Sequence, residues 1–562
     1  MDDAQGDVIA FLRDPSSYPP PHYPPRRAGE GGAGADAGLV EIIETHASLV
    51  FLAGKCAYKL KRAVKYPYLD FSTPELRRAA CTVELKLNRR TAPQLYLEVR
   101  AISRGPDGTL FWGRSGGDRT GDAGEPLDFV VVMRRFDQQD LLENLVRVDG
   151  LSSSLLYALT AHIAAFHAKA ERRLDRGGPP AMTAVTETNI RVLRDCRSAD
   201  FAAPQIDRLE SGLYGELARH GRLLDERRQA GRVRRVHGDL HLRNICLVDG
   251  RPLLFDCVEF SEELASIDVL YDLAFLLMDL DHRGHQGFAN LVLNRYLDLT
   301  EEEDGLMLMP LFLSLRAVIR AHVRATMAEH GWGSGDPGAA VAEARRYLDE
   351  AEAALLPQPA RLVAVGGLSG SGKSALAAGL APGLGRRPGA RVLRSDVLRK
   401  LRFGAEPENP LPPEAYTAEV TVRVYRDLCA RAAAVLRAGY SAVIDAVALR
   451  EEERGWFAAV AAAAGVPFTG LWLEAPAPML LARLGARRGD ASDASPEVLG
   501  QQLSRDPGTI GWTRIDAGRR PRSDAGGGSP SADALSLAGR PYCRVYLTTR
   551  RARGSHSPGC TT

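Results

Sequence analysis

One stretch of eight residues, GLSGSGKS at positions 367–374, limits the possible folds of this chain more than any other. It matches the pattern G-x-x-x-x-G-K-[ST] and stands between an apolar strand (RLVAVGG) and a helix (SALAAGLA), the context that a phosphate-binding loop requires. Gly367, Gly370 and Gly372 would let backbone N–H groups point at phosphate oxygens, and the helix N-terminus adds positive potential. We expect Lys373 to reach the β- and γ-phosphates of ATP, and Ser374 to offer its hydroxyl to Mg²⁺.

Acidic and basic residues downstream of this loop add the groups that phosphoryl transfer needs. Asp396 ends the strand-like segment RVLRSD and Asp445 ends SAVID, so both should open onto the carboxyl edge of a parallel sheet. Asp396 could orient or deprotonate an acceptor hydroxyl, and Asp445 could hold Mg²⁺ through water; either could instead cap a helix N-terminus. Arg483, Arg487 and Arg488 recur at helical spacing, where they could clamp phosphate oxygens from a lid or form a solvated basic face.

The region from about 360 to 516 resembles the small-molecule P-loop kinases, a group that includes gluconate kinase-like and zeta-toxin-like proteins. The resemblance rests on GGLSGSGKS, RSDVLRK, VIDAV and the lid segment RLGARRGDASDAS. It implies that Asp396 activates the acceptor and that the lid arginines bind phosphate. Polynucleotide kinases share this core, so the acceptor stays open.

A second concentrated pattern, HGDLHLRN at 237–244 followed by LLFD at 253–256, points to another phosphotransferase site. Asp239 and Asn244 have the spacing of the H-R-D-x-x-x-x-N loop of protein kinases, and Asp256 follows an apolar strand where a second metal carboxylate would stand. We expect His237 to brace the loop by hydrogen bonds. Two alternatives are a zinc site made by His237, Asp239 and His241, and a purely structural turn.

Lysine is rare in this chain, with 8 residues among the 72 Lys and Arg, and four of the eight lie between positions 55 and 65. A protein-kinase-like site needs a strand lysine that is paired with a helix glutamate and holds the α- and β-phosphates. Lys59 and Lys61 share one face of the strand CAYKLK, and Glu84 lies in the following helix. We predict the pair Lys59–Glu84, with Lys61 as the second choice.

Residues from about 39 to 340 resemble the aminoglycoside phosphotransferase-like kinases, and the whole chain resembles a bacterial two-domain family that joins such a domain to a P-loop kinase. The matching stretches include THASLVFLAGKCAYKLKRAV, VHGDLHLRNICL, LLFDCVEF and IDVLYDLAFLLMDL. The resemblance implies that Asp239 is the catalytic base, that Asn244 and Asp256 bind Mg²⁺, and that Asp268 and Asp272 brace the helical lobe. No G-x-G-x-x-G loop precedes Lys59, so THASLVFLAG must cover the phosphates.

These patterns predict an α+β protein-kinase-like domain followed by an α/β P-loop domain with a mainly parallel sheet. The boundaries are a Pro/Gly-rich N-terminal arm at 1–38, the kinase-like domain at 39–355, the P-loop domain at 360–516 and a basic Gly/Ser/Arg-rich tail without fixed structure at 517–562.

Charge and cysteine usage exclude several classes of function. The net charge is +2, but residues 517–562 contribute +6, which leaves −4 on the rest and argues against a broad nucleic-acid surface. The eight cysteines form no C-x-x-C pair, which suits neither a zinc site nor a disulfide framework and favours the cytoplasm. No apolar run approaches ~18 residues, and the acidic N-terminus lacks a signal pattern, so we expect no membrane segment.

The function predicted from the sequence is an ATP-dependent phosphotransferase with two nucleotide sites that use ATP and Mg²⁺ and transfer the γ-phosphate to hydroxyl groups of small molecules. Two other functions stay open: an ATP-binding sensor in which one or both sites are inactive, and a P-loop kinase of nucleic-acid ends. The oligomeric state is open.

Overall fold

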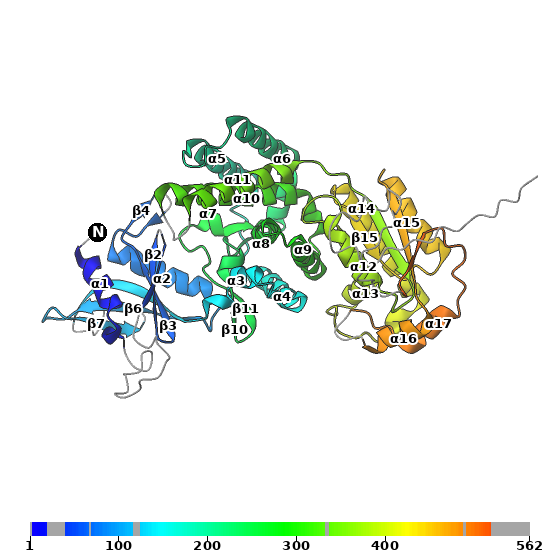
Figure 1. The fold of residues 1–562 in the computed structure, drawn as a ribbon, viewed down its shortest axis with the longest axis horizontal. Coiled ribbons are helices and arrows are strands. Elements are labelled where there is room, and N and C mark those ends of the chain that lie inside the picture. Colours follow the sequence, from blue (N-terminus) through cyan, green and yellow to red (C-terminus); the bar gives the residue numbers. More distant parts are fainter. Residues whose placement is uncertain are drawn as a thin grey trace, which may run out of the picture. The chain divides into compact units, whose positions relative to one another are not determined.

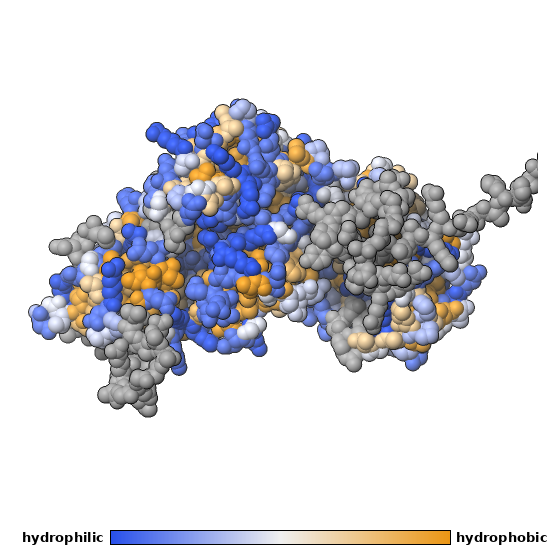
Figure 2. All heavy atoms as spheres, viewed as in Figure 1, coloured by the Kyte–Doolittle hydropathy of each residue, from blue (hydrophilic) through white to orange (hydrophobic). Residues whose placement is uncertain are grey.

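The computed structural model describes residues 3–18, 40–45, 47–66, 69–115, 124–331, 336–486 and 491–518, and the predictions for Arg487, Arg488 and the tail beyond Gly518 lie outside these residues. The chain divides into two compact units (Figure 1). The first unit comprises Met1–Arg283 and Leu311–Leu355, and the second comprises Gly284–Pro310 and Leu356–Thr562. On the face shown in Figure 2, hydrophilic and hydrophobic residues are interspersed over the described surface.

The first unit begins with a six-stranded antiparallel sheet in the order β1-β2-β3-β8-β6-β7. The strands are β1 Glu41–Glu44, β2 Ser48–Ala53, β3 Cys56–Lys61, β6 Tyr96–Arg104, β7 Leu110–Ser115 and β8 Glu125–Arg134, with a small hairpin of β4 Lys65–Tyr66 and β5 Leu69–Asp70. Alternate side chains enter two cores: Ala57 packs on one face of the sheet and Tyr58 on the other. The antiparallel pairing confirms the predicted α+β fold.

A helix covers each face of this sheet. Helix α2 (Pro74–Asn88) is capped by Thr73, whose hydroxyl accepts from the N–H of Leu76, and it buries Cys81 against Phe129. Helix α1 (Asp3–Arg13) covers the opposite face with Val8 and Leu12, which are fully buried. Residues 1–38 were predicted to form a Pro/Gly-rich arm, and the helix at Asp3–Arg13 was not expected.

The rest of the first unit is mainly helical and frames two short strand pairs. The helices are α3 Leu142–Arg147, α4 Ser153–Lys169, α5 Gly178–Asp195, α6 Ala203–Gln229, α7 Glu262–Ala265, α8 Val269–His282, α10 Met309–His330 and α11 Pro337–Leu355. The strand pairs are β9 Val233–Arg235 with β12 Ser266–Asp268, and β10 Ile245–Val248 with β11 Arg251–Leu254. Asp249 and Gly250 both adopt positive φ between β10 and β11, as a two-residue hairpin turn requires.

By length and composition, one span among the described residues, Glu303–His330, could cross a membrane. The most apolar window of this span is 78% buried inside the structure, which is the behaviour of a core helix.

The second unit contains a five-stranded parallel sheet in the order β14-β15-β13-β16-β17. The strands are β13 Leu362–Gly367, β14 Arg391–Arg394, β15 Ala442–Asp445, β16 Phe468–Glu474 and β17 Thr513–Asp516. The helices are α12 Lys373–Leu380, α13 Ser395–Arg402, α14 Ala418–Arg437, α15 Glu451–Ala463, α16 Ala477–Ala486 and α17 Pro496–Leu503. This arrangement confirms the predicted α/β domain with a mainly parallel sheet.

A segment from the middle of the chain belongs to the second unit. It contains α9 (Gln286–Thr300) and η4 (Glu303–Leu308). The side chain of Asn294 accepts a hydrogen bond from the backbone N–H of Val392 in the edge strand β14 (2.7 Å). Arg391 of the same strand forms ion pairs with Asp298 (2.7 Å) and Glu303 (2.9 Å). The segment lies within the range 39–355 that the sequence assigned to the first domain, but it belongs to the second unit and covers the β14 edge of that unit's own sheet.

Candidate functional site

Two lysines of β3 meet one glutamate of α2 in the first unit. The Nζ atom of Lys59 lies 2.8 Å from Oε1 of Glu84, and Nζ of Lys61 lies 2.7 Å from Oε2 of the same carboxylate. Burial alone would raise the pKa of Glu84, but the two lysines outweigh it and lower that pKa to about 2. The structure thus brings together the predicted pair Lys59–Glu84, and it adds Lys61 to the same carboxylate.

Asp256 joins this cluster from the segment after β11. Its Oδ1 lies 2.6 Å from Nζ of Lys59, and its backbone N–H donates to the hydroxyl of Tyr96 (3.1 Å). The residue adopts a left-handed conformation (φ 62°), which is costly for a residue other than glycine and directs its carboxylate toward Lys59. Its side chain is 42% exposed, so the carboxylate is accessible to a ligand.

Asp239 and Asn244 lie side by side in the loop between β9 and β10. The Nδ2 atom of Asn244 donates to Oδ2 of Asp239 (2.8 Å) and to its backbone oxygen (2.9 Å). Nε2 of His241 lies 3.3 Å from the same carboxylate oxygen. Burial would raise the pKa of Asp239, but His241 outweighs it and holds this pKa well below its usual range. Asp239 is therefore an ionised carboxylate that can accept a hydrogen bond from a hydroxyl group.

His237 and Asp272 fix the start of this loop. The backbone N–H groups of His237 and Gly238 donate to the two carboxylate oxygens of Asp272. Nε2 of His237 lies 2.9 Å from the carbonyl oxygen of Phe255, and Nδ1 accepts from the N–H of Asp239. Both ring nitrogens are engaged, so the zinc alternative does not fit, and among the described residues no group of three His, Cys, Asp or Glu side chains could hold a metal ion.

The donors near Asp239 suit a different cation. Asn244 offers an amide oxygen and Asp256 a carboxylate, and oxygen donors of this kind are the ligands that Mg²⁺ prefers. These residues fit the predicted magnesium site.

The expected phosphate cover, THASLVFLAG at 45–54, follows β1 and contains β2, which pairs with β1 in an antiparallel hairpin. The hydroxyl of Thr45 accepts from the N–H of Ser48 (2.9 Å) and donates to its carbonyl oxygen (3.0 Å), which closes the turn between the strands. The side-chain oxygen of Thr45 thus stabilises this turn.

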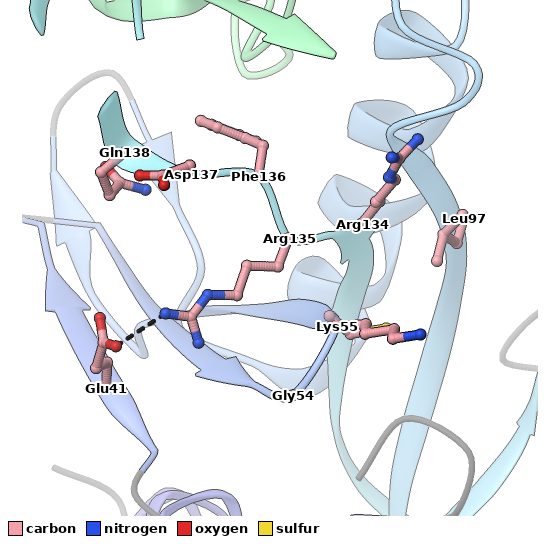
Figure 3. Close-up of a pocket in the computed structure, with 10 residues that line it drawn as sticks. Glu41, Gly54, Lys55, Leu97, Arg134, Arg135, Phe136, Asp137 and Gln138 are labelled. Atoms are coloured by element: carbon pink, nitrogen blue, oxygen red, sulfur yellow. Dashed lines mark hydrogen bonds and ion pairs between the residues drawn. The ribbon is translucent and has the colours of Figure 1, made fainter. Parts of the chain in front are cut away.

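A cavity of about 870 Å³ lies at the other end of this hairpin, beside the β2–β3 turn and the segment after β8 (Figure 3). Arg135 reaches across it to form an ion pair with Glu41 (2.8 Å). None of the predicted site residues lines this cavity.

The phosphate-binding loop of the second unit has the backbone that its glycines permit. Gly367, Gly370 and Gly372 all have positive φ (130°, 82° and 96°). A Cβ atom at Gly370 would lie 2.7 Å from the carbonyl oxygen of Leu480, so only glycine fits there. Helix α12 starts at Lys373, whose ammonium donates to the carbonyl oxygen of Leu368 (3.0 Å).

Ser374 and Asp445 meet beneath this loop. The hydroxyl of Ser374 donates to Oδ2 of Asp445 (2.6 Å), and the guanidinium of Arg394 contacts both side chains (3.2 and 3.3 Å). Asp445 is the last residue of β15, and the next helix begins only at Glu451, so the N-cap alternative for Asp445 is wrong. A hydroxyl and a carboxylate together fit a Mg²⁺ site.

Asp396 lies two residues after Arg394, in α13. Strand β14 ends at Arg394, and Asp396 is the second residue of α13 rather than the last of the strand. The helix is preceded by Arg394 as its cap, so the N-cap alternative for Asp396 is also wrong. Burial raises the pKa of the Asp396 carboxyl, and Arg394 only partly offsets this effect.

The lid arginines are described in part. Arg483 lies in α16 and donates to the carbonyl oxygens of Ser371 in the phosphate loop (3.5 Å) and Ala517 (2.9 Å). Sequence reasoning missed Lys400, whose buried ammonium binds both carboxylate oxygens of Asp493 at 2.7 Å and so attaches the end of the lid segment to α13. The scarcity of lysine in the chain was the one signal that could have singled it out.

Comparisons with known proteins match a separate family to each half of the chain. The phosphotransferase enzyme family matches residues 92–306, and an AAA domain family matches residues 362–506. Uncharacterised proteins of Mycobacterium tuberculosis and Mycobacterium bovis are 32% identical over 497 residues, which cover 87% of this chain and 94% of theirs.

Two solved structures illustrate the two halves. A choline/ethanolamine kinase family protein from Mesorhizobium loti is 15% identical and covers 63% of this chain and 99% of its own (TM-score 0.37). A gluconokinase from Sinorhizobium meliloti is 24% identical and covers 29% of this chain and 84% of its own (TM-score 0.21).

Proposed function

The chain belongs to the family of these mycobacterial proteins and joins a protein-kinase-like phosphotransferase domain to a P-loop domain, and we propose that it is a kinase with two separate ATP sites. The matched families support ATP-dependent phosphotransferase activity in general. The proposal adds that both sites are active and that each transfers the γ-phosphate of ATP to a hydroxyl group of a small molecule.

In the first site, Asp239 would accept the proton of the acceptor hydroxyl. The hydroxyl oxygen would then attack the γ-phosphorus while the bond to the β–γ bridging oxygen breaks, and ADP leaves. Lys59, held by Glu84, would bind the α- and β-phosphates, and Asn244 and Asp256 would hold Mg²⁺. The metal, when bound, supplies positive charge to the phosphate oxygens.

In the second site, the backbone N–H groups of the phosphate loop and Lys373 would bind the β- and γ-phosphates. Ser374 and Asp445, which already touch, would hold Mg²⁺. Asp396 would accept the proton of the second acceptor, and Arg483, which contacts the loop, would stabilise the transferring phosphate.

The observation that supports the proposal is that each unit separately contains a lysine, side-chain oxygen donors and a further carboxylate, the groups that could bind phosphate, hold Mg²⁺ and accept the proton of the acceptor. The −4 charge outside residues 517–562 favours small-molecule acceptors over nucleic acid. The six described cysteines are free thiols, which supports a cytoplasmic location.

The test is a transfer screen with [γ-³²P]ATP, Mg²⁺ and a fractionated metabolite extract. We expect one set of labelled products to disappear in Asp239→Asn and a different set in Lys373→Ala. Asp249→Asn, in the exposed hairpin turn, and Lys169→Ala, at the exposed end of α4, are the matched controls and should retain both sets. A wild type without labelled products, or products that survive both site substitutions, would overturn the proposal.

A further inference from the structure

Lys61 is a second buried lysine of the first site to which the proposed function gives no task. Its side chain is 1% exposed, and its ammonium lies 2.7 Å from Glu84 and 2.6 Å from Oε1 of Glu259. The ring of Phe71 covers it, with the ammonium 4.8 Å from the ring centroid. Burial would lower the pKa of Lys61, but Glu84 and Glu259 outweigh it and keep this pKa above its usual value.

Stability alone does not explain such a group. Removing charges from water carries a large desolvation cost, and replacing a buried ion pair by apolar side chains of similar volume is often neutral or stabilising. A buried ion pair is thus weak evidence for a stabilising role, and in some proteins such a pair fixes a particular geometry instead.

The contacts of Lys61 join three parts of the unit that carry groups of the ATP site. Lys61 itself belongs to β3, which carries Lys59; Glu84 belongs to α2; and Glu259 lies three residues after Asp256. The two oxygens of the Glu84 carboxylate are divided between the two lysines. Lys61 thus touches the partner of Lys59 on one side and the segment that carries Asp256 on the other.

This arrangement matters when nucleotide binds. Lys59 contacts Asp256 in the present structure (2.6 Å), and in the proposed complex both residues turn toward the nucleotide, Lys59 to phosphate and Asp256 to Mg²⁺. Their mutual ion pair is then lost. Neither Lys61 nor Glu259 binds the ligand in the proposed complex, and Glu84 contacts it only through Lys59. The ion pairs of Lys61 with Glu84 and Glu259 can therefore persist and keep α2 and the segment that carries Asp256 in place.

We propose that Lys61 and Glu259 are positioning residues of the first ATP site, which hold Glu84 and the Asp256 segment in the geometry that binds Mg²⁺ and ATP together. The inference rests on the proposed function of this site. It predicts that loss of Lys61 weakens the magnesium-dependent part of nucleotide binding.

The test uses the full chain with Lys373→Ala, so that nucleotide binding reports on the first site. The probe is the non-hydrolysable ATP analogue AMPPNP, titrated by calorimetry with Mg²⁺ and again with EDTA. The variants are Lys61→Met, Glu259→Gln and both together. Lys65→Met is the matched control, because Lys65 pairs with Asp70 at the surface with 72% of its side chain exposed.

We expect Lys61→Met to weaken binding about tenfold with Mg²⁺ and much less with EDTA. Glu259→Gln should act in the same direction, and the double variant should be no weaker than Lys61→Met, because the two residues act as a unit. A purely structural role would lower the melting temperature and leave binding to the folded protein unchanged. Binding within twofold of the Lys373→Ala parent in both Lys61→Met and Glu259→Gln would overturn the inference, and Glu259→Gln decides alone if Lys61→Met does not fold. A parent that binds no AMPPNP would instead overturn the proposed function of this site.

Discussion

Replacing Arg391 by methionine tests whether residues 284–310 stabilise the second unit. Arg391 opens β14, and its side chain is 1% exposed. Its guanidinium forms ion pairs with Asp298 and Glu303 and donates to the side chain of Asn294 (3.2 Å). Methionine keeps most of the aliphatic stem and removes the charge, so the buried acceptors lose their partner.

The size of the effect follows from which carboxylates keep a partner. Removing one partner of a buried ion pair costs about 3–5 kcal/mol. Glu303 keeps an ion pair with Arg431 (3.1 Å), so Asp298 is the main carboxylate that loses its cationic partner. The free energy of unfolding of the second unit should therefore fall by about 3 kcal/mol, the lower end of this range. For a unit of this size that corresponds to a melting temperature lower by roughly 6–12 °C.

The effect should also depend on pH. Burial already raises the pKa of Asp298, and loss of Arg391 raises it further. A carboxyl group whose pKa is higher in the folded than in the unfolded state destabilises the fold fully at pH values above its folded-state pKa. It has no effect on stability at pH values below its unfolded-state pKa, where the group is protonated in both states. The cost of Arg391→Met should therefore be larger at pH 8 than at pH 5.

Hydrogen–deuterium exchange locates this effect in the chain. We expect exchange in peptides of β14 and β15 to rise roughly a hundredfold, while peptides of β2 and β3 stay unchanged as the internal reference. Arg514→Met is the matched control, because Arg514 pairs with Glu474 at the surface and such pairs contribute about 0–1 kcal/mol. Equal exchange in the Arg391→Met and Arg514→Met proteins would refute the reasoning.

Two further predictions concern the acceptor carboxylates and the phosphate loop. The pKa of Asp239 is lowered and that of Asp396 is raised, so Asp239 stays deprotonated, and able to accept a proton, to lower pH than Asp396. Transfer at the first site should therefore persist to lower pH than transfer at the second, which pH–rate profiles measure with the other site inactivated. The prediction is contradicted if activity at the first site is lost at the same or a higher pH than activity at the second. Gly370→Ala should destabilise the second unit by about 1–3 kcal/mol, because the new Cβ would clash with the carbonyl oxygen of Leu480. Gly379→Ala, in α12 with open space around it, should instead stabilise the unit by up to about 1 kcal/mol. Thermal unfolding measures both changes, and a shift of the melting temperature in the same direction for the two variants would contradict the prediction.

Site residues could be predicted from the sequence where they lie close together along the chain. The phosphate loop at 367–374 and the pair Asp239 and Asn244 lie within eight residues each, so spacing and flanking apolar segments define them. The Lys59–Glu84 pair was also predictable, because the order strand then helix limits which glutamate can face the lysine.

Contacts between distant residues could not be predicted in the same way. Lys400 and Asp493 are 93 residues apart, and Lys61 and Glu259 are 198 apart, with no local pattern to link them. The helix α9 continues a run of helices in the sequence, and only packing assigns it to the second unit. Asp396 was placed at the end of a strand because the change from extended to helical backbone falls within RVLRSD and leaves no mark in composition.

The number of ATP molecules bound per chain tests the central claim most directly. Equilibrium dialysis with radiolabelled AMPPNP and Mg²⁺ should give two molecules per wild-type chain. We expect one in Lys59→Met, one in Lys373→Ala and none in the double variant, because each lysine belongs to a different site. One molecule or none per wild-type chain, or two retained in either single variant, would contradict the account.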